Sequence, residues 1–298
     1  MKIAITGASG LIGRPLVPLL RQQGHDVVRF VRGSAPPLAA DELPWDPAGR
    51  HLDPALLTDI DAVIHLAGAG VADHRWTPAY KQQVLNSRVD GTTTLALALA
   101  ACAERPRVLL SASAIGFYGD TGDRVSDEKS PAGQGFLAST CQAWEQATSP
   151  AEAAGVRVAH LRTGIVLSGA GGALGKQAKI FKAGLGAPLG SGRQWVSWIS
   201  LQDELAAIAH LLTADVHGPV NLVGPAPVTN REFTKVLGRV LRRPTLPVPI
   251  PGFVLRAALG EFATEGVLAG QRLLPLVLQD NGFTFAHQTL YEALRASL

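Results

Sequence analysis

The chain is poor in residues that mark several classes of protein. Only two of its 298 residues are cysteines, Cys102 and Cys141, and they match no metal-ligand spacing and no disulfide framework. Seven lysines stand against twenty arginines, and the net charge of +3 is spread along the chain without a basic run. We therefore expect no metal site, no disulfide scaffold and no nucleic-acid surface.

Long hydrophobic stretches are also missing. The longest clean apolar run covers residues 95–103, far short of the roughly 20 residues that a membrane span needs. The N-terminal sequence MKIAITGASG has the pattern of a strand and turn of a folded domain from its first residues, and it lacks the pattern of a signal peptide. These features predict a soluble, cytoplasmic protein that does not bind membranes. We expect a monomer or homodimer, although no sequence feature distinguishes the two.

Hydrophobic residues are abundant. They make up 47% of the chain, which is enough to build a substantial core and excludes a disordered protein. The 32 glycines and 20 prolines follow no collagen period and indicate many tight turns. The length is about twice the ~150 residues typical of one domain, which allows either one large α/β domain or a domain with a smaller second part.

Short β-type runs alternate with helical patterns along the first three quarters of the chain. We expect strands at 2–6, 27–31, 62–66, 108–111, 156–161 and 219–223, and helices ending near 23 and covering 78–103, 137–154 and 201–214. A loop rich in proline and alanine follows the second strand. Repeated β-then-α units predict an α/β fold with a doubly wound parallel sheet, Rossmann-like, covered on both faces.

Three glycines separate the first strand from the first helix. Gly7, Gly10 and Gly13 provide a tight turn, close approach of the backbone to a pyrophosphate, and contact between helix and strand. The N-terminus of the following helix supplies partial positive charge for phosphates. The position inside a βαβ unit favours a dinucleotide site over an ordinary glycine-rich turn.

Several motifs resemble the short-chain dehydrogenase/reductase superfamily, in its extended, NAD(P)-dependent epimerase/dehydratase form. They are TGASGLIG at 6–13, HLAGAG at 65–70, LLSASAIGFYGD at 109–120, RTGIVLSG at 162–169 and VSWISLQDELAAI at 196–208. A finer resemblance is to an atypical epimerase-like branch with its own C-terminal segment. It rests on Trp45-Asp46, the stretch 75–88, Cys141, Trp144-Glu145 and the pair GQRLLP and GFTF near the C-terminus.

Charge beyond the second strand bears on the choice of cofactor. Arg32 follows that strand, with Arg29 and Arg14 as further candidates, and no carboxylate appears before Asp41. This favours NADP(H) over NAD(H) unless Arg32 is only a solvated surface residue. With the resemblance, the expected cofactor-binding residues are Thr6, Gly7, Gly10, Leu11, Ile12, Gly13, Arg32, Asp46, Leu66, Ala67, Gly68 and Ser111.

The resemblance also implies a catalytic Ser, a Tyr, and a Lys four residues after that Tyr. Ser113 matches the serine, but no Tyr-x-x-x-Lys motif exists anywhere in the chain. Leu137 and Cys141 stand in the places of the Tyr and the Lys, and Arg88 in that of an expected Asn. This branch shares those departures, so the usual mechanism cannot simply be transferred.

Other residues offer themselves for acid–base work or substrate binding. Tyr118 is either the proton carrier or part of the lining of the substrate site. Cys141 is a thiol acid, an exposed redox sensor or a small buried hydrophobe. His65 ends a buried strand and is expected to be a satisfied core or cofactor-loop histidine rather than a base. Arg75 and Trp76 either border the substrate cleft or form a packing pair.

Lys176, Lys179 and Lys182 recur every three residues, which is typical of a solvated helix face and would otherwise suit an anionic substrate. We expect an NADP-binding domain over 1–225, with 168–195 contributing to the substrate cleft, and a mainly helical substrate-side segment over 226–298. The predicted function is an NADP(H)-binding oxidoreductase or epimerase-like enzyme for a small carbonyl, alcohol or nucleotide-sugar substrate. The alternatives are a non-catalytic NADP(H)-binding regulator and a redox sensor that uses Cys141.

Overall fold

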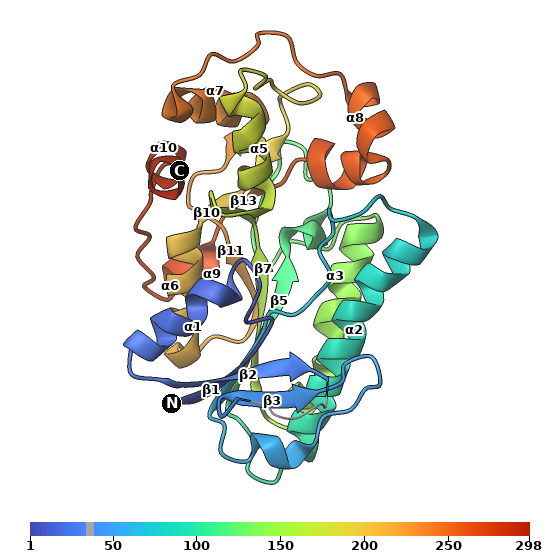
Figure 1. The fold of residues 1–298 in the computed structure, drawn as a ribbon, viewed down its shortest axis with the longest axis vertical. Coiled ribbons are helices and arrows are strands. Elements are labelled where there is room, and N and C mark those ends of the chain that lie inside the picture. Colours follow the sequence, from blue (N-terminus) through green and yellow to red (C-terminus); the bar gives the residue numbers. More distant parts are fainter. Residues whose placement is uncertain (34–38) are drawn as a thin grey trace. The chain divides into compact units, whose positions relative to one another are not determined.

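The computed structural model describes residues 1–33 and 39–298 and contains two compact units. The first comprises Met1–Ser113, Thr140–Leu161 and Ile208–Pro219, and the second Ala114–Ser139, Arg162–Ala207 and Val220–Leu298. The chain therefore passes between them several times, as the sequence colouring of Figure 1 allows the reader to follow.

Most residues of a seven-stranded sheet, in the order β11-β7-β5-β4-β1-β2-β3, belong to the first unit. β1 pairs in parallel with β2 and β4, and β4 with β5. This order, with β1 in the interior and crossovers in both directions, confirms the predicted α/β parallel sheet. The strands are β1 Lys2–Thr6, β2 Asp26–Arg32, β3 Glu42–Trp45, β4 Ala62–His65, β5 Val108–Ala114, β7 Arg157–Thr163 and β11 Gly218–Leu222.

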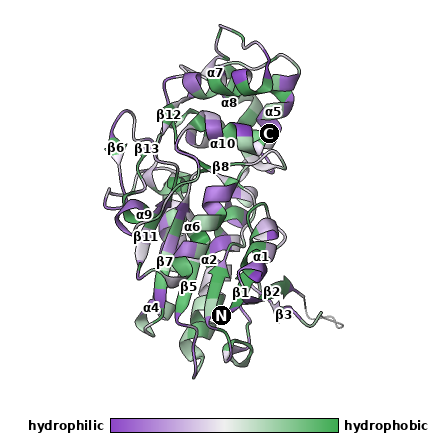
Figure 2. Ribbon diagram, turned by 90° about the vertical axis from the view of Figure 1, so that its left-hand side faces the viewer, coloured by the Kyte–Doolittle hydropathy of each residue, from purple (hydrophilic) through white to green (hydrophobic). Residues whose placement is uncertain are grey.

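Helices cover both faces of this sheet. Figure 1 shows α1 (Gly13–Gln22) on one side of the strands and α2 (Pro78–Ala101) on the other. One face is filled by a buried cluster that includes Val63, Leu95 and Leu109, and the green strands of Figure 2 show how apolar the sheet is. The remaining helices with residues in this unit are η1 Pro54–Leu57, α3 Phe136–Gln146, α4 Ser149–Ala153 and α6 Leu201–Thr213.

Two details of the predicted pattern are wrong. The segment expected to be only a loop contains β3, which pairs with β2 so that Val31 lies opposite Pro44. Pro44 hid this strand, because proline cannot donate to a ladder and is tolerated only at a sheet edge. The helix expected over 137–154 is divided into α3 and α4, since Pro150 lacks the N–H that would bond the carbonyl of residue 146, where α3 ends, and is tolerated in the first turn of α4.

The second unit has small sheets and many helices. Its core includes Leu167, Trp198, Phe233 and Leu290, all buried. The pairs β10–β8 and β13–β6 are parallel, and β12–β9 is antiparallel. Its elements are η2 Ile115–Tyr118, β6 Val125–Ser126, β8 Ile165–Leu167, α5 Gly172–Lys182, β9 Trp195–Val196, β10 Trp198–Ser200, β12 Val228–Thr229, α7 Asn230–Leu241, α8 Gly252–Leu259, η3 Ala263–Leu268, β13 Arg272–Leu273, α9 Leu276–Asp280 and α10 Leu290–Ser297.

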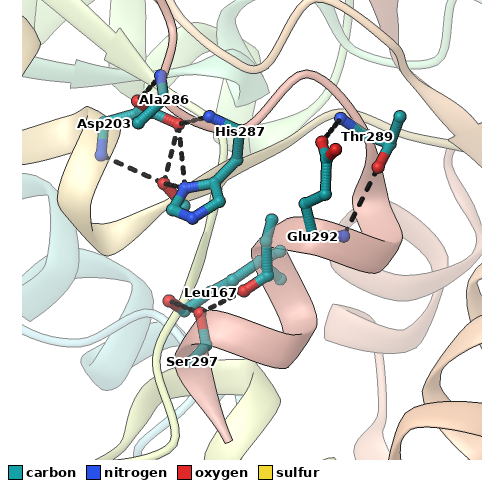
Figure 3. A network of polar contacts seen from close by, with 9 residues as sticks. Leu167, Asp203, Ala286, His287, Thr289, Glu292 and Ser297 are labelled. Carbon is teal, nitrogen blue, oxygen red and sulfur yellow. Dashed lines mark hydrogen bonds and ion pairs between the residues drawn. The ribbon is translucent and has the colours of Figure 1, made fainter.

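The C-terminal segment is tied into this unit by polar contacts (Figure 3). The carboxylate of Asp203, at the start of α6, accepts hydrogen bonds from the backbone N–H groups of Ala286 and His287 at 2.7 and 3.2 Å. Thr289 and Glu292 form a capping box at the start of α10. The segment is therefore an integral part of the second unit.

Candidate cofactor site

A cleft of about 1630 Å³ lies in the first unit, and the glycine loop forms part of its wall. Gly7 has φ +69°, and a Cβ there would lie 2.7 Å from the carbonyl carbon of Leu66. A Cβ at Gly13 would lie 2.3 Å from the oxygen of Gly7. Packing within the protein therefore requires glycine at both positions.

Gly10 differs from its two neighbours in the motif. Among the described residues, a Cβ at this position would meet only the oxygen of Gly7, at 3.2 Å. Gly10 lines the cleft, so the missing side chain leaves the backbone open to a ligand. This is the arrangement that close approach of a pyrophosphate to the loop needs, at the entry to α1.

Thr6 holds the second loop of the cleft in position. Its Oγ1 accepts hydrogen bonds from the backbone N–H groups of Leu66 and Ala67 at 3.1 and 3.2 Å. Its hydroxyl hydrogen is thus directed to Nδ1 of His65, 2.7 Å away, and Nε2–H of His65 donates to Thr92 at 3.0 Å. Thr6 orients the loop, and His65 is the satisfied core histidine that the sequence predicts.

Burial lowers the pKa of His65 to about 4, so the imidazole stays neutral in the folded protein. Because the unfolded pKa is near 6.5, stability is lost as the pH falls from about 6.5 to about 4, by about 3 kcal/mol. NMR titration of the folded protein should show an imidazole that is still largely neutral at pH 5. The urea concentration needed for unfolding should fall as the pH is lowered from about 6.5 to about 4, because the unfolded chain gains the proton. Protonation of His65 near pH 6.5 in the folded protein would contradict this expectation.

Arginines line the part of the cleft beyond β2. Asp41 also lies there, and its carboxylate binds Arg29 and Arg21 at 2.9 and 2.6 Å. The hydrogen bond from Arg29, followed by that from Arg21, lowers the pKa of Asp41 to about 2. Arg32 and Arg14 line the same cleft. The first carboxylate after β2 is thus engaged by two arginines, while two further arginines remain to face a ligand.

The structure distributes the expected cofactor residues over two groups. Asp46 lines the cleft, where its Oδ1 accepts hydrogen bonds from the N–H groups of Ala48 and Gly49 and shapes the turn after β3. The other expected residues that line the cleft are Gly7, Gly10, Arg32, Leu66, Ala67 and Gly68. Those that are not among its lining residues are Thr6, Leu11, Ile12, Gly13 and Ser111.

Ser113 is buried on β5 and donates a hydrogen bond to Oε1 of Glu145 on α3, at 2.7 Å. The sequence motifs included Glu145 but assigned it no role. A signal was present, since Glu145 follows Cys141 by four residues and so shares its helix face. Cys141 itself is 4% exposed, so the exposed thiol required by the redox-sensor alternative is not found.

Arg88 connects the cofactor loop to α3. Its Nη1 donates to the carbonyl oxygen of Ala69 at 2.9 Å, and its guanidinium lies 4.8 Å from the centre of the Trp144 ring. Desolvation lowers the pKa of Arg88. The residue in the place of the expected Asn is therefore a largely buried cation beside the loop that follows β4.

Tyr118, in the second unit, has two partners for its hydroxyl. It donates to Oδ1 of Asn221 at 2.7 Å and accepts from Nη1 of Arg162 at 2.9 Å. It is 1% exposed, and desolvation raises its pKa to about 12. A hydroxyl so engaged serves the buried network, and the role of Tyr118 as proton carrier stays a prediction.

The remaining candidates have ordinary structural surroundings. Trp76 is buried, and its indole N–H donates to the oxygen of Val71 at 2.8 Å, while Arg75 is exposed. Neither lines the cleft of the first unit. Lys176, Lys179 and Lys182 form an exposed face of α5, as the solvated-face interpretation predicts.

The parallel sheet and the glycine loop at the start of α1 define a dinucleotide-binding protein of the Rossmann-like type. The sequence model described as NAD dependent epimerase/dehydratase family matches residues 3–224, and a model described as Domain of unknown function (DUF1731) matches 250–297. The chain belongs to the NAD-dependent epimerase/dehydratase family, as an atypical extended short-chain dehydrogenase/reductase.

Relatives match over nearly the whole length. Epimerase family protein Mb2239 of Mycobacterium bovis is 50% identical over 293 residues, covering 98% of this chain and 96% of its own. Epimerase family protein SDR39U1 of Bos taurus is 34% identical, covering 99% of both chains. The crystal structure of human SDR39U1 (isoform 2) with NADPH has a TM-score of 0.88 at 30% identity and covers 100% of this chain and 99% of that chain.

Over residues 1–33 and 39–298, no helix is both long enough and apolar enough to cross a bilayer.

Proposed function

We propose that this chain is an NADP(H)-dependent oxidoreductase or epimerase-like enzyme for a small carbonyl, alcohol or nucleotide-sugar substrate. The observation that carries the proposal is the cleft of the first unit, with an open Gly10 at one position and Arg14 and Arg32 at another. The human relative whose structure contains NADPH supports the choice of cofactor.

The residues of the cleft fit this cofactor. The backbone around Gly10 and the N-terminus of α1 would hold the pyrophosphate, because both present N–H groups and partial positive charge. Arg32 and Arg14 would bind the ribose 2′-phosphate, and Arg21 and Arg29 keep Asp41 from repelling it. When bound, the nicotinamide would accept or supply a hydride, and the chain would position the reacting carbon beside it.

Replacing Arg32 tests the choice of NADP(H). We expect Arg32→Ala to weaken NADPH binding roughly 10- to 150-fold and to leave NADH binding unchanged, since a charge-assisted hydrogen bond is worth about 1.5–3 kcal/mol. Fluorescence titration of both cofactors with both proteins measures the effect.

Arg107→Ala is the control, because Arg107 is an exposed arginine that does not line the cleft. It should leave both affinities unchanged. An unaltered preference for NADPH in Arg32→Ala would remove the charge argument for this cofactor.

The enzyme interpretation is preferred to a purely regulatory one because Ser113, the residue at the serine position, retains a hydrogen-bonded acidic partner. The division at about residue 225, the contribution of 168–195 to a substrate cleft, the cytoplasmic location and the oligomeric state stay predictions.

A further inference from the structure

An enzyme that transfers a hydride to or from an alcohol or carbonyl must also move a proton. In this chain the positions of the usual Tyr and Lys hold Leu137 and Cys141. A leucine carries no proton to exchange, so the position of the usual Tyr supplies no acid or base. If the proposed function is correct, as this inference requires, another group must carry the proton.

The hydrogen bond between Ser113 and Glu145 provides an acid–base pair of suitable chemistry. Ser113 is 4% exposed, and its hydroxyl donates to the carboxylate across 2.7 Å. A carboxylate that already accepts this hydroxyl hydrogen can take the proton when the serine oxygen receives another. β5 and α3 hold the two residues, so the pair rests on regular elements rather than on a loop.

The sheet register places this pair at the edge from which the cofactor loop emerges. Ser111 lies opposite His65 in the pairing of β5 with β4. The chain after His65 enters the cleft wall at Leu66, while β5 continues to Ser113. Both segments therefore leave the same carboxyl edge of the sheet, where ligands of such folds bind.

Arg88 provides a second connection from the cleft to the pair. It binds the oxygen of Ala69, which lines the cleft, and lies over the ring of Trp144, the residue before Glu145. Arg88 also interacts electrostatically with Cys141, on the same helix as Glu145. A cation thus stands on the helix face that carries the carboxylate.

Unsatisfied polar atoms on the same two elements indicate that something polar is bound here. Ser111 Oγ, Thr140 Oγ1 and Trp144 Nε1 are buried and have no hydrogen-bond partner among the described residues. Ser111 shares a strand face with Ser113, and Thr140 and Trp144 are one helical turn apart. Buried polar groups are normally paired, so these three suit the hydroxyl or carbonyl groups of a ligand.

We propose that Ser113 and Glu145 form a proton relay that replaces the missing Tyr–Lys pair. In alcohol oxidation, the C–H bond of the substrate gives its hydride to the oxidised nicotinamide. The substrate O–H gives its proton to Ser113 Oγ, and the Ser113 hydroxyl proton passes to the Glu145 carboxylate. The products are a carbonyl, the reduced cofactor and a protonated Glu145, and carbonyl reduction follows the same steps in reverse. Ser113 is the catalytic residue, and Glu145 acts through it.

The first test measures the pair without cofactor or substrate. In protein labelled with ¹³C at serine Cβ, we expect the Ser113 resonance to respond to pH in the wild type through its hydrogen bond to the Glu145 carboxylate. The movement should be absent in Glu145→Gln and present in Glu104→Gln, an exposed control. A Ser113 resonance that is insensitive to pH in the wild type, or equally sensitive in Glu145→Gln, would overturn the relay.

The second test measures NADPH oxidation with diacetyl, glyceraldehyde and phenanthrenequinone as probes. Ser113→Ala and Glu145→Gln should each lower the rate about 100-fold, and Glu145→Asp should restore part of it, while NADPH affinity is unchanged. The pH dependence of the rate should change in Glu145→Asp.

Two outcomes separate the relay from the proposed function. If the wild type oxidises NADPH and Glu145→Gln does so equally well, the relay is wrong and the enzyme function stands. If the wild type binds NADPH and reduces none of the three probes, both the hydride transfer and the relay are rejected, and the cofactor site alone remains.

Discussion

Gly13→Ala should lower the free energy of unfolding by about 3 kcal/mol and abolish NADPH binding. The new Cβ would lie 2.3 Å from the oxygen of Gly7 and 2.8 Å from Cα of Ala8, both backbone atoms. Relief requires a shift of the loop or of α1, and overpacking of this kind costs about 1–3 kcal/mol. Urea denaturation and NADPH titration measure the two losses.

Gly10→Ala is the matched variant, because it places the same methyl group three residues earlier. Its Cβ would meet only the oxygen of Gly7, at 3.2 Å, so the fold should lose less than about 1 kcal/mol. NADPH affinity should nevertheless fall at least tenfold, since the methyl group occupies the approach of the pyrophosphate. If Gly10→Ala binds NADPH normally, the phosphates do not lie at this loop.

Glu204→Gln should stabilise the protein on the order of 2–4 kcal/mol at pH 8. Glu204 is fully buried, accepts one hydrogen bond from Thr163 at 3.0 Å, and its Oε2 has no partner among the described residues. Burial raises its pKa to about 8. A glutamine keeps the shape and the bond from Thr163 and carries no charge to bury.

The raised pKa of Glu204 determines how the stability of the protein changes with pH. The unfolded carboxyl titrates near 4.5 and the folded one near 8, so between these values the folded state holds a proton that the unfolded state has lost. Stability of the wild type should therefore fall as the pH rises from 4.5 to 8, and this fall should be smaller in Glu204→Gln. Urea denaturation at several pH values measures it, with Glu104→Gln as an exposed control. Equal pH dependence in wild type and Glu204→Gln would show that Glu204 does not titrate in this way.

Local sequence was sufficient for the nucleotide loop and most of the sheet. Gly7 and Gly13 are required by contacts within a short βαβ unit, so their spacing along the chain is itself the signal. The strands at 2–6 and 62–66 were recognisable because strands buried on both faces are continuous apolar runs. β3 was not predicted because it is an edge strand. An edge strand tolerates a proline, and a proline in the sequence is typical of a loop.

Residues that act through distant partners could not be assigned in this way. Nothing near Asp41 in sequence shows that Arg21 and Arg29 occupy its carboxylate, because the partners come from α1 and β2. The partners of the Tyr118 hydroxyl could not be read from the sequence either, because Arg162 and Asn221 lie 44 and 103 residues further along the chain.

The order of residues alone therefore established the parallel α/β fold, the family resemblance, the glycine loop and the absence of the Tyr–Lys pair. Tertiary structure decided which polar groups are engaged and which remain for a ligand. It buried Cys141, directed Thr6 to the loop after β4, and brought Ser113 to Glu145 across 32 residues of sequence. The reason is physical: backbone conformation is set by neighbours in sequence, whereas desolvation and hydrogen bonding of a side chain depend on whatever the fold packs against it.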